Sequence, residues 1–575
     1  MTLILDLLAQ LISYNKHVLI KYKYRLYFLQ VIIVSLFVLI WIQLFNLQII
    51  KSQGLISKAE KQFYEKPVAL RGDIRDRNGN LLVLDIVNYD LYLKVKSIQE
   101  IKDERINELA EVLKIDPVKL KHKISNTRIN NRISSGISEI TNSKIKKNDF
   151  DFVYLHPVVK RVYPHKRMAA QVVGFINNDR EGQHGVEYAH EDLLTKISER
   201  NSRNSLYQKG TDIVLTIDSA LQEYAEEELA KAVSESRASK GAIIVISPKT
   251  GEIYAWAVQP NYDPNEFFKE KTIKNWSITD IYEAGSTFKV LTVASALETM
   301  SITANSTFYD PGFLKVGKRT IKNHNRGKPQ QITLLELFKQ SSNVASAQVG
   351  LKMGPENFYK AIKKFMIGKK TGIDLPGESQ GLLLDFHKWK EIDCATTGFG
   401  QGAVSVTPIQ LVSAVCAIAN HGLWVQPHIL KGTWEGEYNL INETPMQIKQ
   451  EQSVSSEVAD YVSDLLKQSV QENVEAMAYI AGNVPGYNVA GKTGTAQKLR
   501  PDGKGYWGGH TVASFIGYLP AENPEILTLV VIDDPKTGGG WGNTVCGPVF
   551  NRVASVAAQI YIEKKIRKDE NNNEN

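Results

Sequence analysis

Residues 241–258 read GAIIVISPKTGEIYAWAV, two apolar runs on either side of a Ser-Pro-Lys-Thr-Gly turn. Two further apolar runs, TVASFIGYLP (511–520) and EILTLVVIDDP (525–535), lie near the other end of the chain. Short apolar runs bounded by turn residues predict strands, and the sequence between them has long loops and strongly apolar helical stretches. Strands at both ends of a helical middle predict an α+β domain whose antiparallel sheet joins its first and last segments.

Length, composition and charge bound the class of protein. At 575 residues the chain is long enough for two to four domains, and 43% hydrophobic with 23% charged residues is typical of a chain that buries a core. The net charge of +7, from 69 basic and 62 acidic residues, is small for this length and gives no concentrated basic face. We therefore expect no nucleic-acid partner.

The cysteine and histidine patterns argue against a disulfide scaffold and against a metal centre. Cys394, Cys416 and Cys546 are odd in number and far apart, and the 11 histidines show no metal-ligand spacing. We expect each cysteine to be a small buried hydrophobe. The sequence also contains no Gly-x-x-x-x-Gly-Lys-Ser/Thr phosphate loop. We expect neither a metal nor a cofactor.

Residues 26–50, LYFLQVIIVSLFVLIWIQLFNLQII, contain no charged side chain. At about 1.5 Å per residue such a helix spans a bilayer core, and the run is too long, with no small-residue cleavage site, for a signal peptide. Basic residues crowd its N-terminal side (Lys16, Lys21, Lys23 and Arg25), whereas only Lys51 and Lys58 follow it closely. The positive-inside rule predicts a single-pass anchor in the cytoplasmic membrane, with residues 1–25 inside and the remainder on the periplasmic face.

The segment after the anchor has weaker patterns. PVALRGDIRDRNGNLLVLDIVNYDLYLKV (67–95) alternates on both sides of Asn78-Gly79, which predicts a hairpin. INELAEVLKI (106–115) has helical spacing. The Lys/Arg run from Lys119 to Lys147 is interpreted as a solvated helical face in preference to a basic binding patch.

Ser-x-x-Lys occurs three times, and two of the copies lie after residue 50. Ser143 to Lys146 lies in a lysine-rich polar stretch and is predicted to be surface. Ser286 to Lys289 lies in EAGSTFKVLTVASALETM, where a glycine precedes an apolar helical run, so the serine falls at a helix N-terminus and the lysine follows one turn later. Backbone N–H groups there favour a developing oxyanion, and apolar neighbours lower a lysine pKa, which makes Lys289 a candidate base for Ser286. The alternative is a plain helix cap with a snorkelling lysine.

Ser-x-Asn and Lys-Thr-Gly also recur. Of three Ser-x-Asn copies, at Ser13, Ser202 and Ser341, only Ser341-Ser342-Asn343 separates two helical stretches and can hold a hydroxyl and an amide in fixed places. Lys-Thr-Gly begins at Lys249, Lys370, Lys492 and Lys536. The composition around three of these predicts turns, whereas GYNVAGKTGTAQK predicts an extended strand. On that strand, Lys492, Thr493 and Thr495 can line one edge.

The ordered triple, Ser286-x-x-Lys289, Ser341-x-Asn343 and Lys492-Thr493-Gly494, is the motif set of penicillin-binding proteins and class A β-lactamases. The chain resembles a class B penicillin-binding protein, a peptidoglycan D,D-transpeptidase, from the anchor to about Ile562. Other segments that carry the resemblance are RGDIRDRNG (71–79), RVYPHKRMAAQVVGF (161–175), GVE (185–187), TIDSALQ (216–222) and FGQGAVSVTPIQLVSA (399–414). Its length and its short segment before the anchor are most similar to the division-specific, FtsI-type members.

The resemblance implies a domain organisation. After the cytoplasmic segment 1–25 and the anchor 26–50, residues 51–235 would form an elongated, mainly β, non-catalytic pedestal. Residues 236–565 would form the transpeptidase domain, an antiparallel sheet flanked by helices as in serine β-lactamases. The polar residues 566–575 would be a disordered tail.

The resemblance also implies a role for each motif residue. Ser286 would be the nucleophile, Lys289 its base and Ser341 a proton relay, while Asn343 would hold the substrate amide. Lys492 and Thr493 of the Lys492-Thr493-Gly494 motif would bind the terminal carboxylate, helped by Thr495. The backbone N–H groups of Ser286 and Thr495 would form the oxyanion hole.

The implied partners are stem peptides of peptidoglycan and lipid-linked precursor strands, β-lactams bound covalently at Ser286, and glycosyltransferase and divisome membrane proteins. Septal wall synthesis in cell division is the expected role, with an elongation-specific transpeptidase as the alternative. A D,D-carboxypeptidase or β-lactamase would share the triple but has no need of the anchor and the long pedestal. A β-lactam-acylated sensor or scaffold would be labelled at Ser286 without cross-linking anything.

Overall fold

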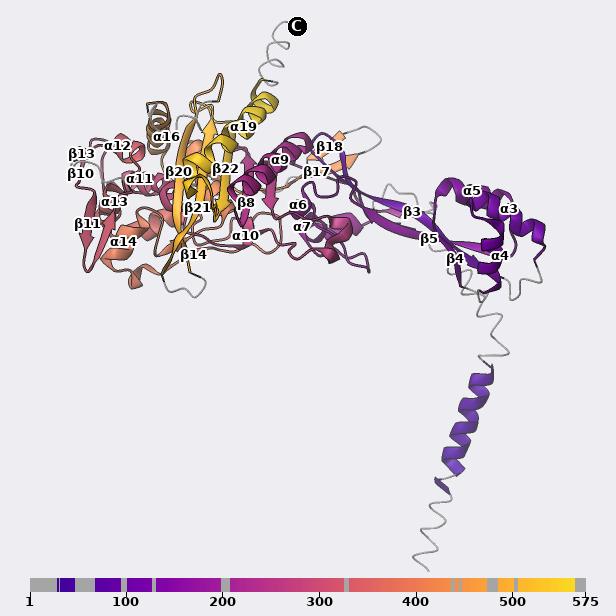
Figure 1. Ribbon diagram of the computed structural model, residues 1–575. Coiled ribbons are helices and arrows are strands. Elements are labelled where there is room, and N and C mark those ends of the chain that lie inside the picture. The colour runs from indigo at the N-terminus through magenta and orange to yellow at the C-terminus, as the bar shows by residue number, and fades with distance from the viewer. Residues whose placement is uncertain are drawn as a thin grey trace, which may run out of the picture. The chain divides into compact units, whose positions relative to one another are not determined.

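The computed structural model describes residues 28–29, 31–46, 68–94, 101–126, 131–197, 207–324, 330–435, 440–443, 447–472, 484–500 and 505–563. Contacts divide the chain into two units, and the larger, residues 69–201 and 209–575, contains the two domains treated below. Figure 1 shows their helices and strands.

A five-stranded antiparallel sheet lies at the centre of the second domain (Figure 1). Its strands, in spatial order, are β20 (Ala490–Leu499), β21 (Tyr506–Leu519), β22 (Ile526–Asp533), β8 (Lys240–Ile246) and β9 (Ile253–Gln259). The late strand β22 pairs with the early strand β8, with Val530 opposite Ile243. The predicted α+β sheet that joins the first and last segments of the domain is therefore confirmed.

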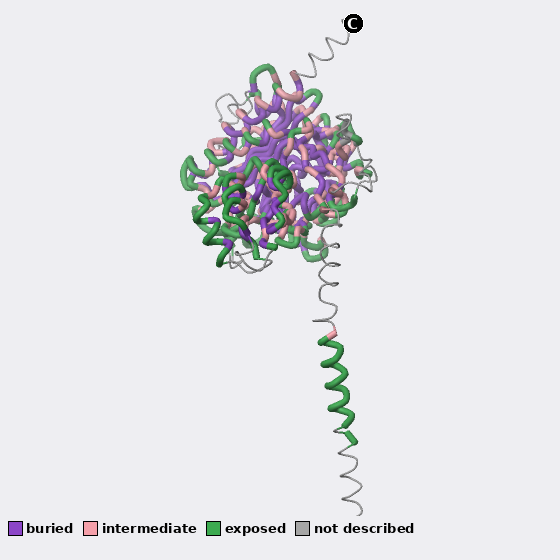
Figure 2. The backbone as a smooth tube through the Cα atoms, turned by 90° about the vertical axis from the view of Figure 1, so that its right-hand side faces the viewer, coloured by how far each residue is buried: buried purple, intermediate pink, exposed green. Residues whose placement is uncertain are grey.

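Helices cover both faces of this sheet. α9 (Ser219–Ser236) and α19 (Gly547–Ala558) pack on the face that carries Ile243 and Val245. Residues of α11 (Lys289–Glu298), α15 (Pro408–Ala419) and α16 (Ser456–Gln471) share a core with Ile244 on the opposite face. Because both faces are buried, β8 is a nearly continuous apolar run instead of an alternating one. Figure 2 shows these buried segments in purple in the interior.

The helical middle of this domain carries short strands and turns around α11. In chain order these are η3 (Pro264–Lys269), α10 (Trp276–Thr279), η4 (Gly285–Phe288), β10 (Phe308–Asp310), β11 (Phe313–Val316), β12 (Arg319–Lys322), β13 (Gln330–Ile332), α12 (Leu334–Lys339), α13 (Asn343–Lys364), β14 (Leu382–Leu383), η5 (Phe386–Lys388), α14 (Glu391–Thr397), β15 (Val404–Ser405), β16 (Leu423–Val425) and β19 (Gln450–Gln452). After β22 follow η6 (Gly538–Gly540) and α18 (Gly542–Val545), and η7 (Gln559–Glu563) comes after α19. The strands pair as β10–β13, β11–β12, β14–β15 and β16–β19.

The first domain is built on a second sheet. Its strands are β2 (Ile74–Arg75), β3 (Leu81–Leu93), β4 (Arg132–Ile137), β5 (Val153–Val162) and β7 (Ile213–Leu215), and β17 (Leu430–Glu435) and β18 (Leu440–Glu443) extend it. The short strands β1 (Val68–Leu70) and β6 (Tyr207–Lys209) lie near the two ends of the same region. The predicted hairpin at Asn78-Gly79 is confirmed, because β2 pairs antiparallel with β3 across that turn.

The expectation that the pedestal is mainly β is wrong. Helices α3 (Asp103–Leu113), α4 (Pro117–Ser125) and α5 (Glu139–Lys147) pack apolar side chains onto the end of β3, and α6 (Ala170–Val173), α7 (Gly185–Ala189) and α8 (Glu191–Thr195) follow β5. Each of α3, α4 and α5 buries only two or three residues. The helical spacing of residues 106–115 and the helical face from Lys119 to Lys147 indicated helices here, whereas the mainly β pedestal that the resemblance implied left them out. The lysines between Lys119 and Lys147 on α4 and α5 are exposed, as a solvated face requires.

A buried ion network holds the first domain together. Glu187, on α7, has no solvent exposure and accepts hydrogen bonds from Arg71 (Nη2–Oε2, 2.8 Å) and Arg161 (Nε–Oε1, 2.7 Å). Arg71 also pairs with Glu191 at 2.7 Å, and Arg161 with Asp85 at 3.4 Å. The RGD and GVE segments therefore converge on one structural cluster.

The predicted membrane anchor, residues 26–50, lies partly outside the described residues, as do segment 1–25 and the tail 566–575. Residues 31–46 are helical with exposed side chains almost throughout, as Figure 2 shows. Among the helices of the described residues, none meets both the length and the hydropathy that a membrane crossing requires.

Candidate active site

The structure places Ser286 at the start of the helix that was predicted to follow it. Gly285 to Phe288 form the 3₁₀ turn η4, which runs directly into α11 at Lys289. Gly285 adopts a left-handed φ of 60°, and its N–H donates to the carbonyl of Gly400 at 3.1 Å. A Cβ on Gly400 would lie 2.4 Å from the carbonyl oxygen of Gly285. The loop with Gly400 thus fits closely against the serine turn and fixes where Ser286 points.

Lys289 is fully buried one turn beyond the serine. Its Nζ donates to the carbonyl of Ser341 at 2.5 Å, to the Oγ of Ser341 at 3.2 Å and to the Oδ1 of Asn343 at 2.9 Å. Burial holds the pKa of Lys289 well below its usual range, and the nearby Lys492 ammonium lowers it further. A lysine in this setting exists as a free amine at a lower pH than a surface lysine, which is what a general base requires.

The Ser341–Asn343 segment forms a tight turn between α12 and α13. Ser341 has a φ of 51°, a left-handed conformation that a non-glycine residue adopts only when its surroundings impose it. Ser342 caps α13 by accepting from the N–H of Ala345 at 3.0 Å. In this turn the Oγ of Ser341 donates to the Oγ of Ser286 at 2.9 Å. Two motifs 55 residues apart are therefore in direct contact.

Lys492 lies on β20, the edge strand of the five-stranded sheet, in the extended setting that the sequence predicted. Its side chain is buried, and burial lowers its pKa to about 8. Among the hydrogen-bond acceptors of the described residues, the Nζ of Lys492 contacts only those of Thr493. It lies 3.2 Å from the carbonyl oxygen and 3.3 Å from the Oγ1 of that residue. Thr493 and Thr495 alternate with Lys492 and Gly494 along β20 and are half-buried, and the Oγ1 of Thr493 lies beside the Nζ of Lys492.

Gly494 and Thr495 join β20 to the serine turn. A Cβ on Gly494 would lie 2.3 Å from the Oγ of Ser514 and 2.8 Å from a methyl carbon of Thr287, so only glycine fits there. Across the turn, a Cβ on Gly285 would lie 3.0 Å from the carbonyl oxygen of Thr495. The backbone of β20 therefore passes directly beside Ser286. As an edge strand it leaves one row of N–H and C=O groups without a strand partner.

The structure separates these motifs from the copies that share their letters. Lys249 lies in the turn after β8 and pairs with Glu525 at 2.7 Å, and Lys536 follows β22 and pairs with Asp534 at 2.6 Å. Lys370 lies in an irregular segment after α13, and Ser143 is exposed on α5. The Ser-x-Asn copies at Ser13 and Ser202 lie outside the described residues.

Sequence reasoning missed Asp310, at the end of β10. This buried carboxylate accepts from the Oγ of Ser342 at 2.5 Å and from the Nδ2 of Asn323 at 2.7 Å. Asn323 in turn accepts from the N–H of Val344, at the start of α13, at 3.0 Å. The only sequence signal is the turn-forming Asp-Pro-Gly at residues 310–312, which does not distinguish a turn from a site.

Sequence reasoning also missed an aromatic contact between the two walls of the site. The rings of His324 and Trp541 are 4.0 Å apart between centroids. His324 follows Lys322, whose carbonyl accepts from Asn343 at 3.2 Å. Trp541 precedes Gly542, whose N–H donates to Thr495 at 3.1 Å. The contact therefore links the wall that carries Asn343 to the wall that carries Thr495.

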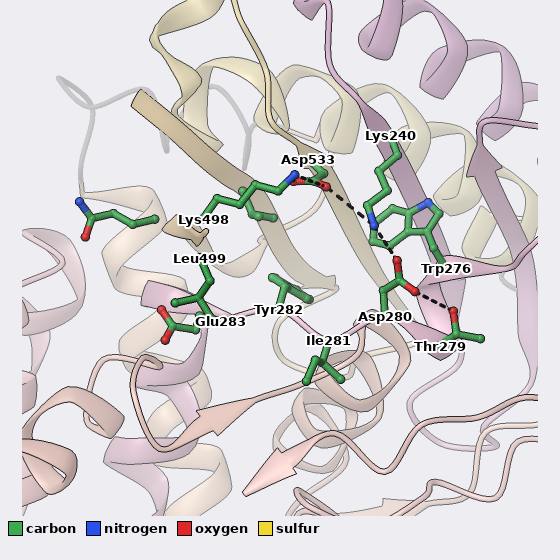
Figure 3. Close-up of a pocket in the computed structure, with 12 residues that line it drawn as sticks. Lys240, Trp276, Thr279, Asp280, Ile281, Tyr282, Glu283, Lys498, Leu499 and Asp533 are labelled. Atoms are coloured by element: carbon green, nitrogen blue, oxygen red, sulfur yellow. Dashed lines mark hydrogen bonds and ion pairs between the residues drawn. The ribbon is translucent and has the colours of Figure 1, made fainter. Parts of the chain in front are cut away.

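A cavity of about 440 Å³ lies where β20 ends, beside the segment that leads into Ser286. Figure 3 shows Lys498 pointing toward Asp533 and Lys240 pointing toward Asp280, and these pairs lie at 2.8 Å. Glu283 lines the opposite side; it accepts from the N–H of Gly402 at 2.8 Å, and burial raises its pKa.

Neither the cysteines nor the potential metal ligands form a cluster in the described residues. Cys394, Cys416 and Cys546 are buried and free, as predicted, and burial raises the pKa of all three thiols. Within the part of the chain that the structure describes, no three His, Cys, Asp or Glu side chains group as metal ligands would.

Comparison with protein families matches both domains. The model of the penicillin-binding protein transpeptidase domain matches residues 241–555, and that of the penicillin-binding protein dimerisation domain matches residues 66–204. The chain is 31% identical to stage V sporulation protein D of Bacillus subtilis, over 92% of this chain and 84% of that protein. It is 30% identical to the peptidoglycan D,D-transpeptidase FtsI homolog of Mesostigma viride, over 92% of this chain and 96% of that one.

Solved structures match over the same region. Penicillin-binding protein 3 of Mycobacterium tuberculosis, in complex with aztreonam, has a TM-score of 0.67 at 26% identity and covers 86% of this chain and 96% of its own. A putative peptidoglycan glycosyltransferase of Atopobium parvulum has a TM-score of 0.65 at 29% identity and covers 86% and 98%.

Proposed function

The chain belongs to the class B penicillin-binding proteins and is a peptidoglycan D,D-transpeptidase of the FtsI/penicillin-binding protein family, and from this premise we propose how its residues carry out the reaction. The observation that carries the proposal is the continuous hydrogen-bonded path from Ser286 through Ser341 to Lys289. It joins a nucleophile, a relay and a buried base of low pKa.

In the first half-reaction, Ser286 attacks the carbonyl between the two terminal D-alanines of a stem peptide. The hydroxyl proton passes to Lys289, whose amine is free because burial and Lys492 lower its pKa. The oxyanion forms beside the backbone N–H groups of Ser286 and Thr495, an arrangement typically worth about 10²–10³ in rate. Ser341 then delivers the proton to the departing D-alanine nitrogen, and the peptide remains on Ser286 as an ester.

Substrate binding uses the free edge of β20. The donor peptide lies along this edge as an added strand, which satisfies its unpaired backbone groups. Lys492 and Thr493 hold the terminal carboxylate, with Gly494 allowing the close approach of the strand and Thr495 adding its backbone. Asn343 turns its amide to the peptide, with its Oδ1 already fixed by Lys289 at 2.9 Å.

In the second half-reaction an amine of another stem peptide attacks the ester, and the two strands are cross-linked. A carboxypeptidase or β-lactamase would resolve the same ester with water. The test offers the enzyme a D-Ala-D-Ala pentapeptide together with a free D-amino acid. Transpeptidation predicts the exchanged peptide as a product, whereas release of tetrapeptide alone would show a hydrolase, and penicillin labelling with no turnover would show a sensor.

Residues 26–50 anchor the protein in the cytoplasmic membrane, with residues 1–25 inside and residues 51–575 on the periplasmic face. The absence of charge across this segment and the basic residues that precede it support the proposal. Cell fractionation of the full chain and of a chain that starts at residue 51 tests it. We expect only the full chain in the membrane fraction; two soluble chains would contradict it.

The cross-links are made at the division septum, with divisome and glycosyltransferase membrane proteins as partners. FtsI-named relatives over more than 90% of this chain support this role. Imaging of a fluorescently tagged chain tests it, with signal at mid-cell expected. Signal along the side wall would instead indicate the elongation-specific alternative.

A further inference from the structure

Asp310 is a buried carboxylate whose hydrogen-bond donors, among the described residues, are all neutral. It accepts from the Oγ of Ser342 at 2.5 Å, from the N–H of Gly312 at 2.8 Å, and from the Nδ2 of Asn323 at 2.9 and 2.7 Å to its two oxygens. Only 4% of its surface is exposed. A buried carboxylate costs free energy even when it is hydrogen-bonded, so its position beside the reactive groups calls for an explanation.

The donors lead from Asp310 to the turn that carries Ser341 and Asn343. Ser342 is the residue between those two, and its hydroxyl both donates to Asp310 and caps the N–H of Ala345. Asn323 donates to Asp310 and accepts from the N–H of Val344 at 3.0 Å. The first turn of α13 is therefore tied to one carboxylate through two side chains.

This tie is mechanically relevant because the turn is strained. Ser341 has a φ of 51°, and a residue in that region persists only where its neighbours hold it. Relaxation of the turn would move the Oγ of Ser341 away from Ser286, to which it donates at 2.9 Å. It would also move the Ser341 carbonyl and the Asn343 amide, which are both contacts of Lys289.

Asp310 acts on Lys289 through its charge as well. Burial and Lys492 both lower the pKa of Lys289, and the charge of Asp310 raises it. A base needs a pKa close to the working pH, because one that is too low binds a proton too weakly. The negative charge behind the turn therefore opposes the loss of basicity that burial causes.

We propose that Asp310 is a positioning residue of the acylation step: through Ser342 and Asn323 it fixes the turn whose residues Ser341 and Asn343 contact Lys289. The proposal rests on the roles of Ser286 and Lys289 given above. It predicts separate consequences for the hydrogen bond and for the charge, and two variants distinguish them.

The experiment measures the second-order rate of acylation by a fluorescent penicillin from pH 5 to 10, in the full-length protein. Ser342→Ala removes one hydrogen bond to the carboxylate and keeps its charge. Asp310→Asn keeps the shape and removes the charge, and it also places an amide donor against that of Asn323. Each variant loses a bond to a charged group, so we expect a fall of about tenfold to a hundredfold at neutral pH.

The acidic limb is the part of the pH profile in which the acylation rate rises as Lys289 loses its proton. Its position distinguishes the effect of the lost charge from the effect of the lost hydrogen bond. In Asp310→Asn the limb moves to lower pH, because Lys289 loses a negative charge that favours its protonated form. In Ser342→Ala the rate falls with the limb unmoved. Thermal melting of both variants shows whether they fold, and if Asp310→Asn does not, a wild-type rate in Ser342→Ala still overturns the positioning role.

An unmoved acidic limb in a folded Asp310→Asn variant would overturn the effect of the Asp310 charge on Lys289, and a wild-type rate in that variant would overturn the positioning role. Failure of the catalytic assignment itself would look different, because the wild-type protein would then react no faster than Ser286→Ala. The two failures are therefore distinguishable in one set of measurements.

Discussion

The hydroxyl of Ser341 donates a hydrogen bond to the hydroxyl of Ser286 across 2.9 Å. Ser341 stands on a turn between two helices and Ser286 on the 3₁₀ turn that begins α11. Lys289 contacts the same Ser341 Oγ at 3.2 Å, so a proton leaving Ser286 has a path of two short steps to a buried amine. The contact turns two separate sequence motifs into one reactive group.

Replacement of Ser341 by alanine removes the relay and leaves the nucleophile in place. We expect acylation by a fluorescent penicillin to slow by about 10²-fold or more, the range of a lost acid–base group. Ser143→Ala, in the exposed Ser-x-x-Lys copy on α5, is the matched control and should react like the wild type. A Ser341→Ala variant that is acylated at the wild-type rate would remove Ser341 from the mechanism.

The rate of acylation should have a bell-shaped pH profile. It rises through the pKa of Lys289, which must lose its proton to act as a base and whose pKa is lowered by burial. It falls above pH of about 8, where Lys492 loses the charge that holds the substrate carboxylate. Stopped-flow labelling across pH measures both limbs. Lys492→Arg, which stays charged, should lose the alkaline limb; a limb that stays near pH 8 in this variant would contradict its assignment to Lys492.

Gly494→Ala should abolish or strongly reduce acylation. The added Cβ would lie 2.3 Å from the Oγ of Ser514 and 2.8 Å from Thr287, so β20 must move away from the serine turn. The matched control is Gly508→Ala on β21, where the added carbon meets no atom within 4 Å. Penicillin labelling and thermal melting compare the two variants. Equal reactivity would show that the close approach of β20 to Ser286 is not required.

Glu187→Ala should destabilise the first domain without touching the active site. The substitution leaves the buried charges of Arg71 and Arg161 without the carboxylate that they share. We expect this to lower the free energy of unfolding by about 3–5 kcal/mol. Glu181→Ala removes an exposed carboxylate of the same domain and should change stability by less than about 0.5 kcal/mol. Denaturant titration of both variants measures the difference. A Glu187→Ala variant whose free energy of unfolding lies within about 1 kcal/mol of the wild-type value would contradict the structural role of Glu187.

The sequence predicted the catalytic domain in most of its particulars, because local pattern and tertiary position agree there. β8, β22 and the second half of β21 are continuous apolar runs bounded by turn residues, and the 3₁₀ turn that leads into α11 begins at the glycine that precedes Ser286. The strand setting of Lys492 separated it from Lys249, Lys370 and Lys536, which the structure places outside strands.

The rest required three-dimensional contacts. The local pattern indicated helices at residues 106–115 and from Lys119 to Lys147, where α3, α4 and α5 lie, but the family resemblance implied a mainly β pedestal, and that expectation was wrong. Asp310 and Asn323 reach Ser342 from 32 and 19 residues away, through side-chain hydrogen bonds that no local pattern records. The His324–Trp541 contact joins residues from loops on opposite walls of the site.

The most direct test of the account is the site of covalent modification by penicillin. Wild-type protein, Ser286→Ala and Ser143→Ala are each treated with a fluorescent penicillin, and the labelled peptide is identified by mass spectrometry. The account predicts one penicilloyl adduct on Ser286 in the wild type and in Ser143→Ala, and no label in Ser286→Ala. A folded Ser286→Ala protein that is still labelled would contradict the assignment of Ser286 as the nucleophile.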